Sequence, residues 1–242
     1  MIDTKPKSLS SEIQLTADGS HTLFVPSMDE HYHSVNGAKT EAEHIYINYG
    51  LSQCKASSIN ILEIGFGTGL NAYLSLVESE NSNRKIVYTS LELYPLSMNQ
   101  VKELNYPKVI YPEFADLYYR LHEAEWGKLS EIVPTFSLLK INTDFTKISD
   151  SEKSLEWTLG TIENKLVLYD VVYFDAFAPE KQPEMWQQEF FDSIYKSMNT
   201  NGILTTYCAK GVIRRMLQSA GFKVEKLPGP PGKREVLRAT KL

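Results

Sequence analysis

Asp175 is the residue of this sequence best placed to do chemistry. It follows the apolar run Val171–Phe174 and precedes Ala-Phe-Ala-Pro, so a carboxylate stands at the end of a predicted buried strand. A carboxylate there can bind an ammonium group, accept its proton and hold the nitrogen at attack distance. The alternative is a structural aspartate that caps a helix beginning near Pro183. We favour the reactive role and expect Asp175 to be a catalytic base.

Three glycines spaced two apart follow another apolar run. Ile59–Ile64 leads into Gly65, Gly67 and Gly69, and a helix-period segment comes next. Glycines at such a turn let a ligand approach the backbone at a helix N-terminus. A dinucleotide loop would read G-x-G-x-x-G, whereas this one reads E-x-G-x-G-x-G from Glu63. It resembles motif I of Rossmann-like methyltransferases and indicates S-adenosylmethionine, with a plain strand-to-helix turn as the alternative.

Two more acidic residues stand at predicted strand ends. Glu92 follows the run Ile86–Leu91, where a carboxylate can accept hydrogen bonds from ribose hydroxyls, as it also does in dinucleotide sites. Asp144 follows the run Phe136–Ile141 and can accept a hydrogen bond from an adenine amino group. An ordinary aspartate turn or helix cap is the alternative for Asp144. Together the two carboxylates favour an adenosine-containing cofactor.

The elements that must position these residues alternate between strand and helix patterns. Ile203–Tyr207 is a fifth apolar run typical of a strand buried on both faces, and Glu235–Thr240 is the predicted last strand. Four apolar stripes at helical spacing lie between the runs: Phe114, Leu117, Tyr118 and Leu121; Leu155, Leu159 and Ile162; Trp186, Phe190, Ile194 and Met198; Val212, Ile213, Met216 and Leu217. The alternation predicts an α/β, doubly wound, Rossmann-like sheet that binds ligands at the carboxyl ends of its strands.

The first 50 residues have a different character. Residues 12–50 are polar and aromatic, with short alternating stretches such as His21–Val25, which predicts a small β-rich segment. We therefore expect residues 1–50 to form an N-terminal extension packed on a catalytic domain of residues 51–242.

Composition excludes several classes of protein. The chain has 242 residues, of which 42% are hydrophobic and 23% charged, as in ordinary globular proteins. The N-terminal residues lack the apolar segment of a secretory signal, and no apolar stretch approaches the roughly 18 residues that cross a bilayer. Cys54 and Cys208 show no metal-type or redox-type spacing. We expect a cytoplasmic protein that has no disulfide and does not associate with membranes.

Charge is distributed unevenly along the chain. The net charge of −5 combines +7 from Cys208 onward with −12 in the remainder. A basic segment on an acidic protein is a possible footprint for a polyanion. On charge alone, a solvated surface is the simpler interpretation.

Six segments together resemble one known family, the methyltransferase domain of the MnmC-type bifunctional tRNA modification enzymes, called MnmD when it stands alone. The segments are 29–38, 63–71, 91–96, 175–179 with 183–186, 207–211 with 214–215, and 232–235. The combination of Asp-Ala-Phe-Ala-Pro, Pro-Glu-Met-Trp and Lys-Arg-Glu is specific, although no single piece would suffice.

The resemblance implies a reaction and a set of site residues. Family members use S-adenosylmethionine to methylate 5-aminomethyl-2-thiouridine at the wobble position of certain tRNA anticodons, which gives 5-methylaminomethyl-2-thiouridine. The implied catalytic residue is Asp175, and the implied cofactor-binding residues are Glu63, Gly65, Gly67, Gly69, Asn71, Glu92 and Asp144. Since phosphates dominate tRNA affinity, we assign basic residues to the substrate side together with two aromatic ones: Tyr32, Phe177, Lys210, Arg214, Arg215, Lys233 and Arg234.

The segment around Tyr32 allows a second interpretation. His31 and His33 are two residues apart, as in some metal sites, and Glu41, Glu43 or His44 could be a third ligand. Zinc sites ordinarily need three or four ligands, so we expect no metal. Instead we expect the segment to line the substrate mouth, with Tyr32 stacking on a flipped base.

Many family members continue into a flavin-dependent oxidoreductase domain that removes a carboxymethyl group before methylation. This sequence ends at Leu242 and has a single glycine-rich nucleotide loop, so we expect no FAD and no oxidoreductase activity. The substrate amine would then come from a separate oxidoreductase or from the machinery that aminomethylates wobble uridines.

Three other functions stay open. A small-molecule N-methyltransferase would share the fold, and its basic C-terminal segment would be incidental. A non-catalytic tRNA-binding module would not need the intact glycine loop and Asp175. A nicotinamide-dependent dehydrogenase is disfavoured by the glycine spacing, and thermal stabilisation by S-adenosylmethionine but not by NAD would exclude it.

Overall fold

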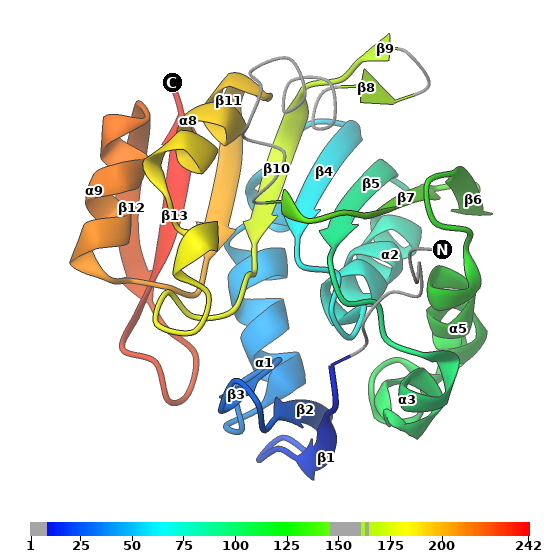
Figure 1. Ribbon diagram of the computed structural model, residues 1–242. Helices are drawn as coiled ribbons and strands as arrows, with labels where there is room; N and C mark the ends of the chain where they lie inside the picture. The colour runs from blue at the N-terminus through cyan, green and yellow to red at the C-terminus, as the bar shows by residue number, and fades with distance from the viewer. Residues whose placement is uncertain (1–8, 146–160, 163–164) are drawn as a thin grey trace, which may run out of the picture.

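The computed structural model describes residues 9–145, 161–162 and 165–242. Its centre is an eight-stranded sheet in the order β12-β13-β11-β10-β4-β5-β7-β6 (Figure 1). The five parallel strands are β4 (Ser58–Ile64), β5 (Lys85–Glu92), β7 (Phe136–Asn142), β10 (Tyr169–Phe174) and β11 (Met198–Thr206). Antiparallel strands complete both edges: β6 (Leu129–Val133), β12 (Phe222–Pro228) and β13 (Glu235–Lys241).

Helices cover both faces of the sheet. One face carries α2 (Leu70–Ser82), α3 (Met98–Glu103), α4 (Tyr106–Val109), the 3₁₀ turn η3 (Pro112–Phe114) and α5 (Ala115–Glu123). The other face carries the 3₁₀ turn η4 (Pro183–Met185), α8 (Gln188–Lys196) and α9 (Gly211–Ser219). Strand β10 shows why both layers are needed. Val171 and Tyr173 pack in the first core and Val172 and Phe174 in the second, because successive strand side chains point to opposite faces.

The connections create one crevice at the centre of the sheet. From β4 the chain runs outward to β5 and β7, then returns to β10 on the other side of β4 and continues to β11. The strand order therefore reverses between β4 and β10. In doubly wound sheets, ligands bind outside the carboxyl ends of the strands at this point.

The N-terminal segment packs beyond those carboxyl ends (Figure 1). A small antiparallel sheet, β1 (Glu12–Leu15), β2 (His21–Val25) and β3 (Glu30–His31), confirms the β-rich character of its first half. The prediction is wrong for the second half, which forms α1 (Ala38–Ala42), the π-helix η1 (Glu43–Asn48) and the 3₁₀ turn η2 (Leu51–Gln53). Ala38, Ala42, Ile45 and Tyr46 recur at helical spacing and are buried in the same core as α2. Burial of this stripe favours a helix there.

Other differences between the predicted and the observed elements concern the edge strands of the sheet and the ends of single elements. The edge strands β6 and β12 were not predicted, because only part of each is buried and neither shows a continuous apolar run. Met198, assigned to a helical stripe, begins β11. Leu155 and Leu159 lie outside the described residues, and Ile162 belongs to the short strand β8 (Thr161–Ile162), paired with β9 (Lys165–Leu166). Within the described part of the chain, no helix combines the length and apolarity needed to cross a bilayer.

Candidate active site

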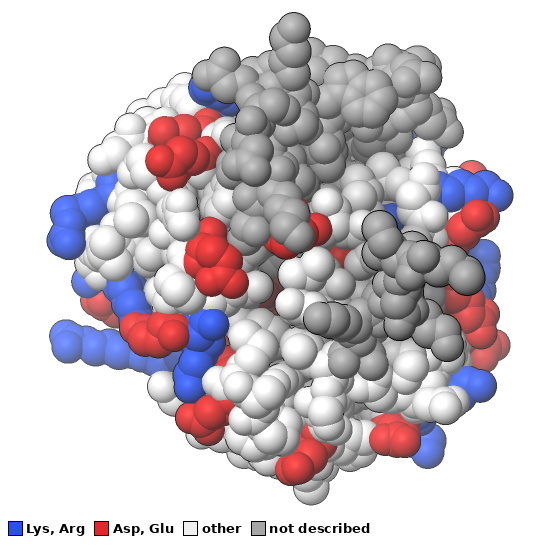
Figure 2. Space-filling view, viewed as in Figure 1, with Lys and Arg blue, Asp and Glu red and all other residues white. Residues whose placement is uncertain are grey.

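A cavity of about 400 Å³ opens where the strand order reverses. Its walls include the loops that follow β4, β5, β7 and β10, and the segment Glu30–Val35 closes it from the N-terminal side. The space-filling view shows this hollow near the middle of one face (Figure 2). Its volume is within the range of pockets that bind small ligands.

Asp175 lies in the wall of this cavity, directly after β10. Its Oδ1 accepts a hydrogen bond from the Tyr46 hydroxyl at 2.6 Å, and its Oδ2 accepts one from Asn71 Nδ2 at 2.8 Å. The two donors come from η1 and from the first turn of α2. The carboxylate is therefore fixed from two sides before any ligand enters.

Burial raises the pKa of Asp175 to about 7, with the nearby Glu41 carboxylate acting in the same direction. The hydrogen bonds from Tyr46 and Asn71 and the charge of Lys233 oppose this rise. A carboxyl with a pKa near neutral can exchange a proton with a bound amine at physiological pH.

The glycine loop needs glycine at two positions for steric reasons. Gly65 has φ +97°, and a Cβ there would lie 2.8 Å from the backbone oxygen of Asp175. Gly67 has φ +51°, and its Cβ would lie 2.9 Å from the Tyr32 ring. The loop therefore approaches both the reactive strand end and the N-terminal segment more closely than any side chain would allow.

Glu92 holds the same loop from the other side. Its Oε2 accepts a hydrogen bond from the Gly67 amide at 2.8 Å, and its Oε1 accepts one from the Tyr94 amide at 2.7 Å. Burial raises the pKa of Glu92, and these backbone donors oppose that shift. Each carboxylate oxygen has a further lone pair, so Glu92 can still accept ribose hydroxyls.

Residues 30–35 form the wall opposite the sheet. The Tyr32 ring meets the Phe177 ring edge-on at a centroid distance of 5.1 Å. His33 Nε2 is 2.8 Å from the Thr68 hydroxyl, in the turn between the loop glycines. Burial lowers the pKa of His33 to about 4, so this imidazole is neutral at physiological pH. Its hydrogen bond with Thr68 connects the N-terminal segment to the glycine loop.

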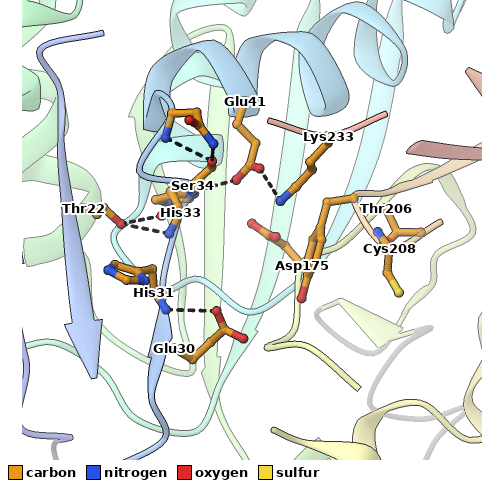
Figure 3. Close-up of polar contacts among 12 residues, drawn as sticks. Thr22, Glu30, His31, His33, Ser34, Glu41, Asp175, Thr206, Cys208 and Lys233 are labelled. Carbon is orange, nitrogen blue, oxygen red and sulfur yellow. Dashed lines mark hydrogen bonds and ion pairs between the residues drawn. The ribbon is translucent and has the colours of Figure 1, made fainter. Parts of the chain in front are cut away.

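An internal ion pair completes the cavity (Figure 3). Lys233 Nζ lies 2.8 Å from Glu41 Oε2 and 5.0 Å from the centroid of the Tyr207 ring. Glu41 Oε1 also accepts a hydrogen bond from the Ser34 amide at 3.1 Å. Figure 3 shows the Lys233 ammonium directed toward Glu41, on the side of the site where Asp175 lies. Two of the carboxylates that line the cavity, Asp175 and Glu41, thus lie on the same side of it as the cation of Lys233.

Comparison with known proteins connects this geometry to a family. The model of an S-adenosyl-L-methionine-dependent methyltransferase family matches residues 127–242. Two bifunctional MnmC proteins, named for tRNA 5-methylaminomethyl-2-thiouridine biosynthesis, are similar over most of the chain. The protein from Campylobacter fetus is 27% identical over 90% of this chain, and that from Pseudoalteromonas atlantica is 31% identical over 94%. The crystal structure of MNMC2 from Aquifex aeolicus matches with a TM-score of 0.74 and 26% identity, covering 97% of this chain and 72% of that one.

This chain is an S-adenosyl-L-methionine-dependent methyltransferase, and it is similar to proteins of the MnmC type over most of its length. The α/β Rossmann-like methyltransferase fold and the cofactor predicted from the sequence are thereby confirmed. The methyltransferase spans about a third of the length of the curated relatives it matches (34% and 33% for the two named above).

The residues expected to bind the cofactor divide into two groups. The methyltransferase brings Gly65, Gly67, Asn71, Glu92 and Asp144 to the wall of the cavity. Gly69 is the N-cap residue of α2 and does not line the cavity, and Glu63 is fully buried in β4 outside it. The structure thus places the Glu63 side chain in the interior of the protein and not on the cavity wall.

The residues expected to bind the substrate divide in the same way. Tyr32, Phe177 and Lys233 line the cavity. Four basic residues do not: Lys210, Arg214, Arg215 and Arg234. Lys210 forms an ion pair with Glu180, and Arg215 and Arg234 are exposed. Lys233 was expected on a phosphate-binding surface, but its ion pair with Glu41 draws it inward.

Sequence reasoning missed Tyr46 altogether and considered Glu41 only as a metal ligand. Both residues lie in the helical segment 38–48, which was predicted to be β structure, so their side chains were not expected at the site. The stripe of Ala38, Ala42 and Ile45 was the available signal, because it places Tyr46 on the buried side of the helix.

The two histidines of the N-terminal segment have different partners. His31 Nε2 lies 3.0 Å from the Gln14 side chain, and His33 is bound to Thr68. Among the described residues, no three His, Cys, Asp or Glu side chains come together in a way that could hold a metal ion. The segment does line the cavity, and the stacking of Tyr32 on a substrate base stays a prediction.

Proposed function

We propose that this methyltransferase transfers the methyl group of S-adenosylmethionine to the primary amine of 5-aminomethyl-2-thiouridine at the wobble position of tRNA. The observation that carries the proposal is the Asp175 carboxylate, held by Tyr46 and Asn71 in the wall of a cavity that it shares with the glycine loop. The MnmC relatives, named for this modification, support tRNA as the substrate. They favour neither a small-molecule N-methyltransferase nor a non-catalytic tRNA-binding module.

The cofactor side of the cavity fits adenosine and a flexible methionine tail. Glu92 offers carboxylate oxygens to the ribose, and Asp144 lies in the wall that would surround the adenine. Gly65 and Gly67 leave the backbone of the loop open to close approach. Bound there, S-adenosylmethionine would supply an activated methyl group.

Asp175 prepares the amine for attack. A primary alkyl amine has a pKa near that of lysine, about 10, and is mostly protonated at neutral pH. The ionised carboxylate attracts this ammonium, accepts one proton and orients the lone pair. The amine nitrogen then forms the new N–C bond as the S–C bond breaks, and the proton remains on Asp175.

A pH profile would report on this step. The kcat/KM for tRNA should rise with pH and reach half its maximum near pH 7, because Asp175 must be ionised and its pKa is about 7. Tyr46→Phe removes a donor to the ionised form, so the midpoint should move to higher pH. A rate that stays constant between about pH 5.5 and 8.5 would show that Asp175 is not the titrating base.

Methylation of defined tRNA tests the proposed function. The purified protein should transfer label from S-adenosylmethionine to tRNA carrying 5-aminomethyl-2-thiouridine, detected by nucleoside mass spectrometry. It should leave 5-carboxymethylaminomethyl-2-thiouridine unmodified even when FAD is supplied. The added carboxylate would lie beside Asp175 and Glu41, and like charges in a desolvated site are strongly unfavourable.

Phosphate contacts should make the two tRNAs bind with similar affinity, so the difference should appear in turnover. Labelled product from the carboxymethylated tRNA alone would contradict the proposal. The amine would be generated by a separate oxidoreductase or by the uridine-aminomethylating machinery, in the cytoplasm with the tRNA.

We further propose that tRNA phosphates contact the basic surface beside the cavity. Several Lys and Arg side chains lie at the left of the face in Figure 2, on the side where α9 lies, with Asp and Glu side chains between them. Arg215→Ala combined with Arg234→Ala should raise the KM for tRNA and reduce the salt dependence of binding. The log–log slope should fall by about 1 for each phosphate that is no longer neutralised. Filter binding over a salt series measures this slope.

Two matched variants define the surface. Lys196 is exposed at the end of α8, near the start of β11 and therefore at the opposite end of the parallel strands, so Lys196→Ala should leave the slope unchanged. Lys233→Ala should also leave it unchanged, because its ammonium is paired inside the cavity with Glu41. An unaltered slope in the double arginine variant would place the tRNA on another face.

A further inference from the structure

Glu63 is a buried acid that the proposed reaction does not use. It lies in β4, two residues before Gly65, and its side chain is fully buried (0% exposed) outside the cavity wall. Burial raises the pKa of this carboxyl well above its usual range, and the nearby Asp175 carboxylate adds to the rise. Burial therefore favours the protonated form of Glu63, which has one hydrogen to donate.

The partners of Glu63 link it to the reactive centre. Ser90 Oγ donates to Glu63 Oε2 at 2.7 Å, from the neighbouring strand β5. The side chains of Asn71 and Tyr88 also interact with the same carboxyl, and both oppose the rise of its pKa. Asn71 in turn donates from Nδ2 to Asp175 Oδ2 at 2.8 Å. A continuous path of polar groups thus runs from the interior of the sheet to Asp175.

Three buried atoms along this path lack another hydrogen-bond partner among the described residues: Glu63 Oε1, Asn71 Oδ1 and the Tyr88 hydroxyl. Unsatisfied buried polar atoms are costly. A proton on Glu63 and the hydroxyl of Tyr88 supply the donors these atoms need, and both side chains already face one another. The group that best satisfies Asn71 Oδ1 is therefore Glu63.

From this geometry we infer that Glu63 is a positioning residue, which fixes the Asn71 amide with its NH₂ group on Asp175, and not part of the cofactor site. The inference rests on the proposed function of Asp175. An asparagine amide has two ends of nearly equal size and opposite polarity. If it turned over, Oδ1 would face the Asp175 carboxylate, and Oδ2 of that carboxylate would lose its donor.

The other groups around Asp175 do not replace this donor. Tyr46 bonds to Oδ1, while Glu41, Lys233 and Tyr207 act on Asp175 through their charge or polarity. Glu63 and Tyr88 face it from the sheet. Loss of the Asn71 bond alone should therefore raise the pKa of Asp175, because that bond favours the ionised form.

Two variants of Glu63 in the full chain separate the roles. Glu63→Gln keeps a donor and an acceptor, so it should retain turnover and the pH profile of the unmodified protein. Glu63→Met keeps the volume but removes the donor. It should lower kcat at pH 7 by about tenfold or more, as expected for losing a hydrogen bond to a charged group, and move the titration of Asp175 to higher pH. Affinity for S-adenosylmethionine, measured by calorimetry, should stay within about threefold in both, since neither change touches the cavity wall.

Coupling to Asn71 gives a stricter test. Asn71→Ala should reproduce the effect of Glu63→Met, and adding Glu63→Met to Asn71→Ala should cause little further loss, because both changes remove the same bond. Fully additive effects would overturn the inference. So would a Glu63→Gln variant that binds S-adenosylmethionine at least tenfold more weakly while Asp175 titrates unchanged, because that result would make Glu63 a cofactor ligand.

The inference can fail separately from the proposed function. Carbon-13 NMR of aspartate carboxyls follows the titration of Asp175 without tRNA, with Asp175→Asn identifying its signal. An unmodified protein that does not methylate aminomethylated tRNA would contradict the proposed function. An Asp175 titration unmoved by Glu63→Met, in a variant with a normal melting temperature, would contradict the positioning role.

Discussion

Asp175→Asn should reduce methyl transfer to aminomethylated tRNA by about 10²- to 10⁴-fold, the usual contribution of general acid–base catalysis. The amide keeps the size of the carboxylate and can still accept a hydrogen bond from Asn71 or Tyr46. It cannot accept the proton of the amine, and it does not attract an ammonium group. Single-turnover measurements with saturating S-adenosylmethionine isolate this effect from product release.

The same variant should bind S-adenosylmethionine with nearly unchanged affinity. The residues proposed to hold the adenosine, which are Glu92, Asp144 and the glycine loop, line the cavity, and the substitution removes no partner of theirs. A Kd that changes by more than about tenfold would show that the carboxylate contacts the cofactor. Near-normal turnover in the variant would remove Asp175 from the reaction.

The difference in stability between Asp175→Asn and the unmodified protein should change with pH in a defined direction. The pKa of Asp175 is about 7 in the folded protein and about 3.9 in an unfolded chain. A raised pKa means that the protonated carboxyl stabilises the fold at low pH, and this stabilisation is lost as the pH rises through about 7. At pH 8 the neutral amide should therefore melt at the same temperature as the unmodified protein or higher, and thermal denaturation measures this.

The second large effect is expected at Glu92. Glu92→Ala should weaken S-adenosylmethionine binding by about 1.5–3 kcal/mol, the range for a hydrogen bond to a charged group. The Gly67 and Tyr94 amides would also lose their acceptor, so the loop that faces the cofactor would be less ordered. Calorimetry gives the affinity, and kcat at saturating cofactor should change much less.

A matched control separates this effect from loss of charge. Glu189 is an exposed carboxylate on α8, on the far side of the second core, and Glu189→Ala should leave cofactor binding unchanged. Equal affinities in Glu92→Ala and Glu189→Ala would remove Glu92 from the cofactor site.

The parts of the site that were predictable are those formed by short stretches of sequence. Gly65, Gly67, Glu92 and Asp175 each follow an apolar strand, and parallel strands bring their carboxyl ends to one edge of a sheet. Once the alternation of strands and helices is recognised, these residues must meet. The N-terminal segment was harder, because its helical stripe is short and lies between aromatic residues typical of strands.

Contacts between distant segments could not be predicted from local patterns. Tyr46 and Asp175 are 129 positions apart, and Asn71 and Asp175 are 104 positions apart. No local pattern indicates that a tyrosine on a π-helix will bond to a strand-end aspartate. Lys233 shows the same limit, since its basic neighbour Arg234 is exposed while its own ammonium turns inward to Glu41.

The sequence by itself determined the five parallel strands of the sheet, the cofactor class and the family resemblance, because these depend on residue spacing within each segment. Tertiary structure alone decided which charged groups face the cavity and which lie in the interior. Glu63 belongs to the glycine motif, yet the alternation of side chains along β4 turns it away from the cavity, while the backbone of the next residues forms its wall. Burial then changes the chemistry of both carboxyls, since removing water raises the pKa of Glu63 well above its usual range and brings the pKa of Asp175 to about 7.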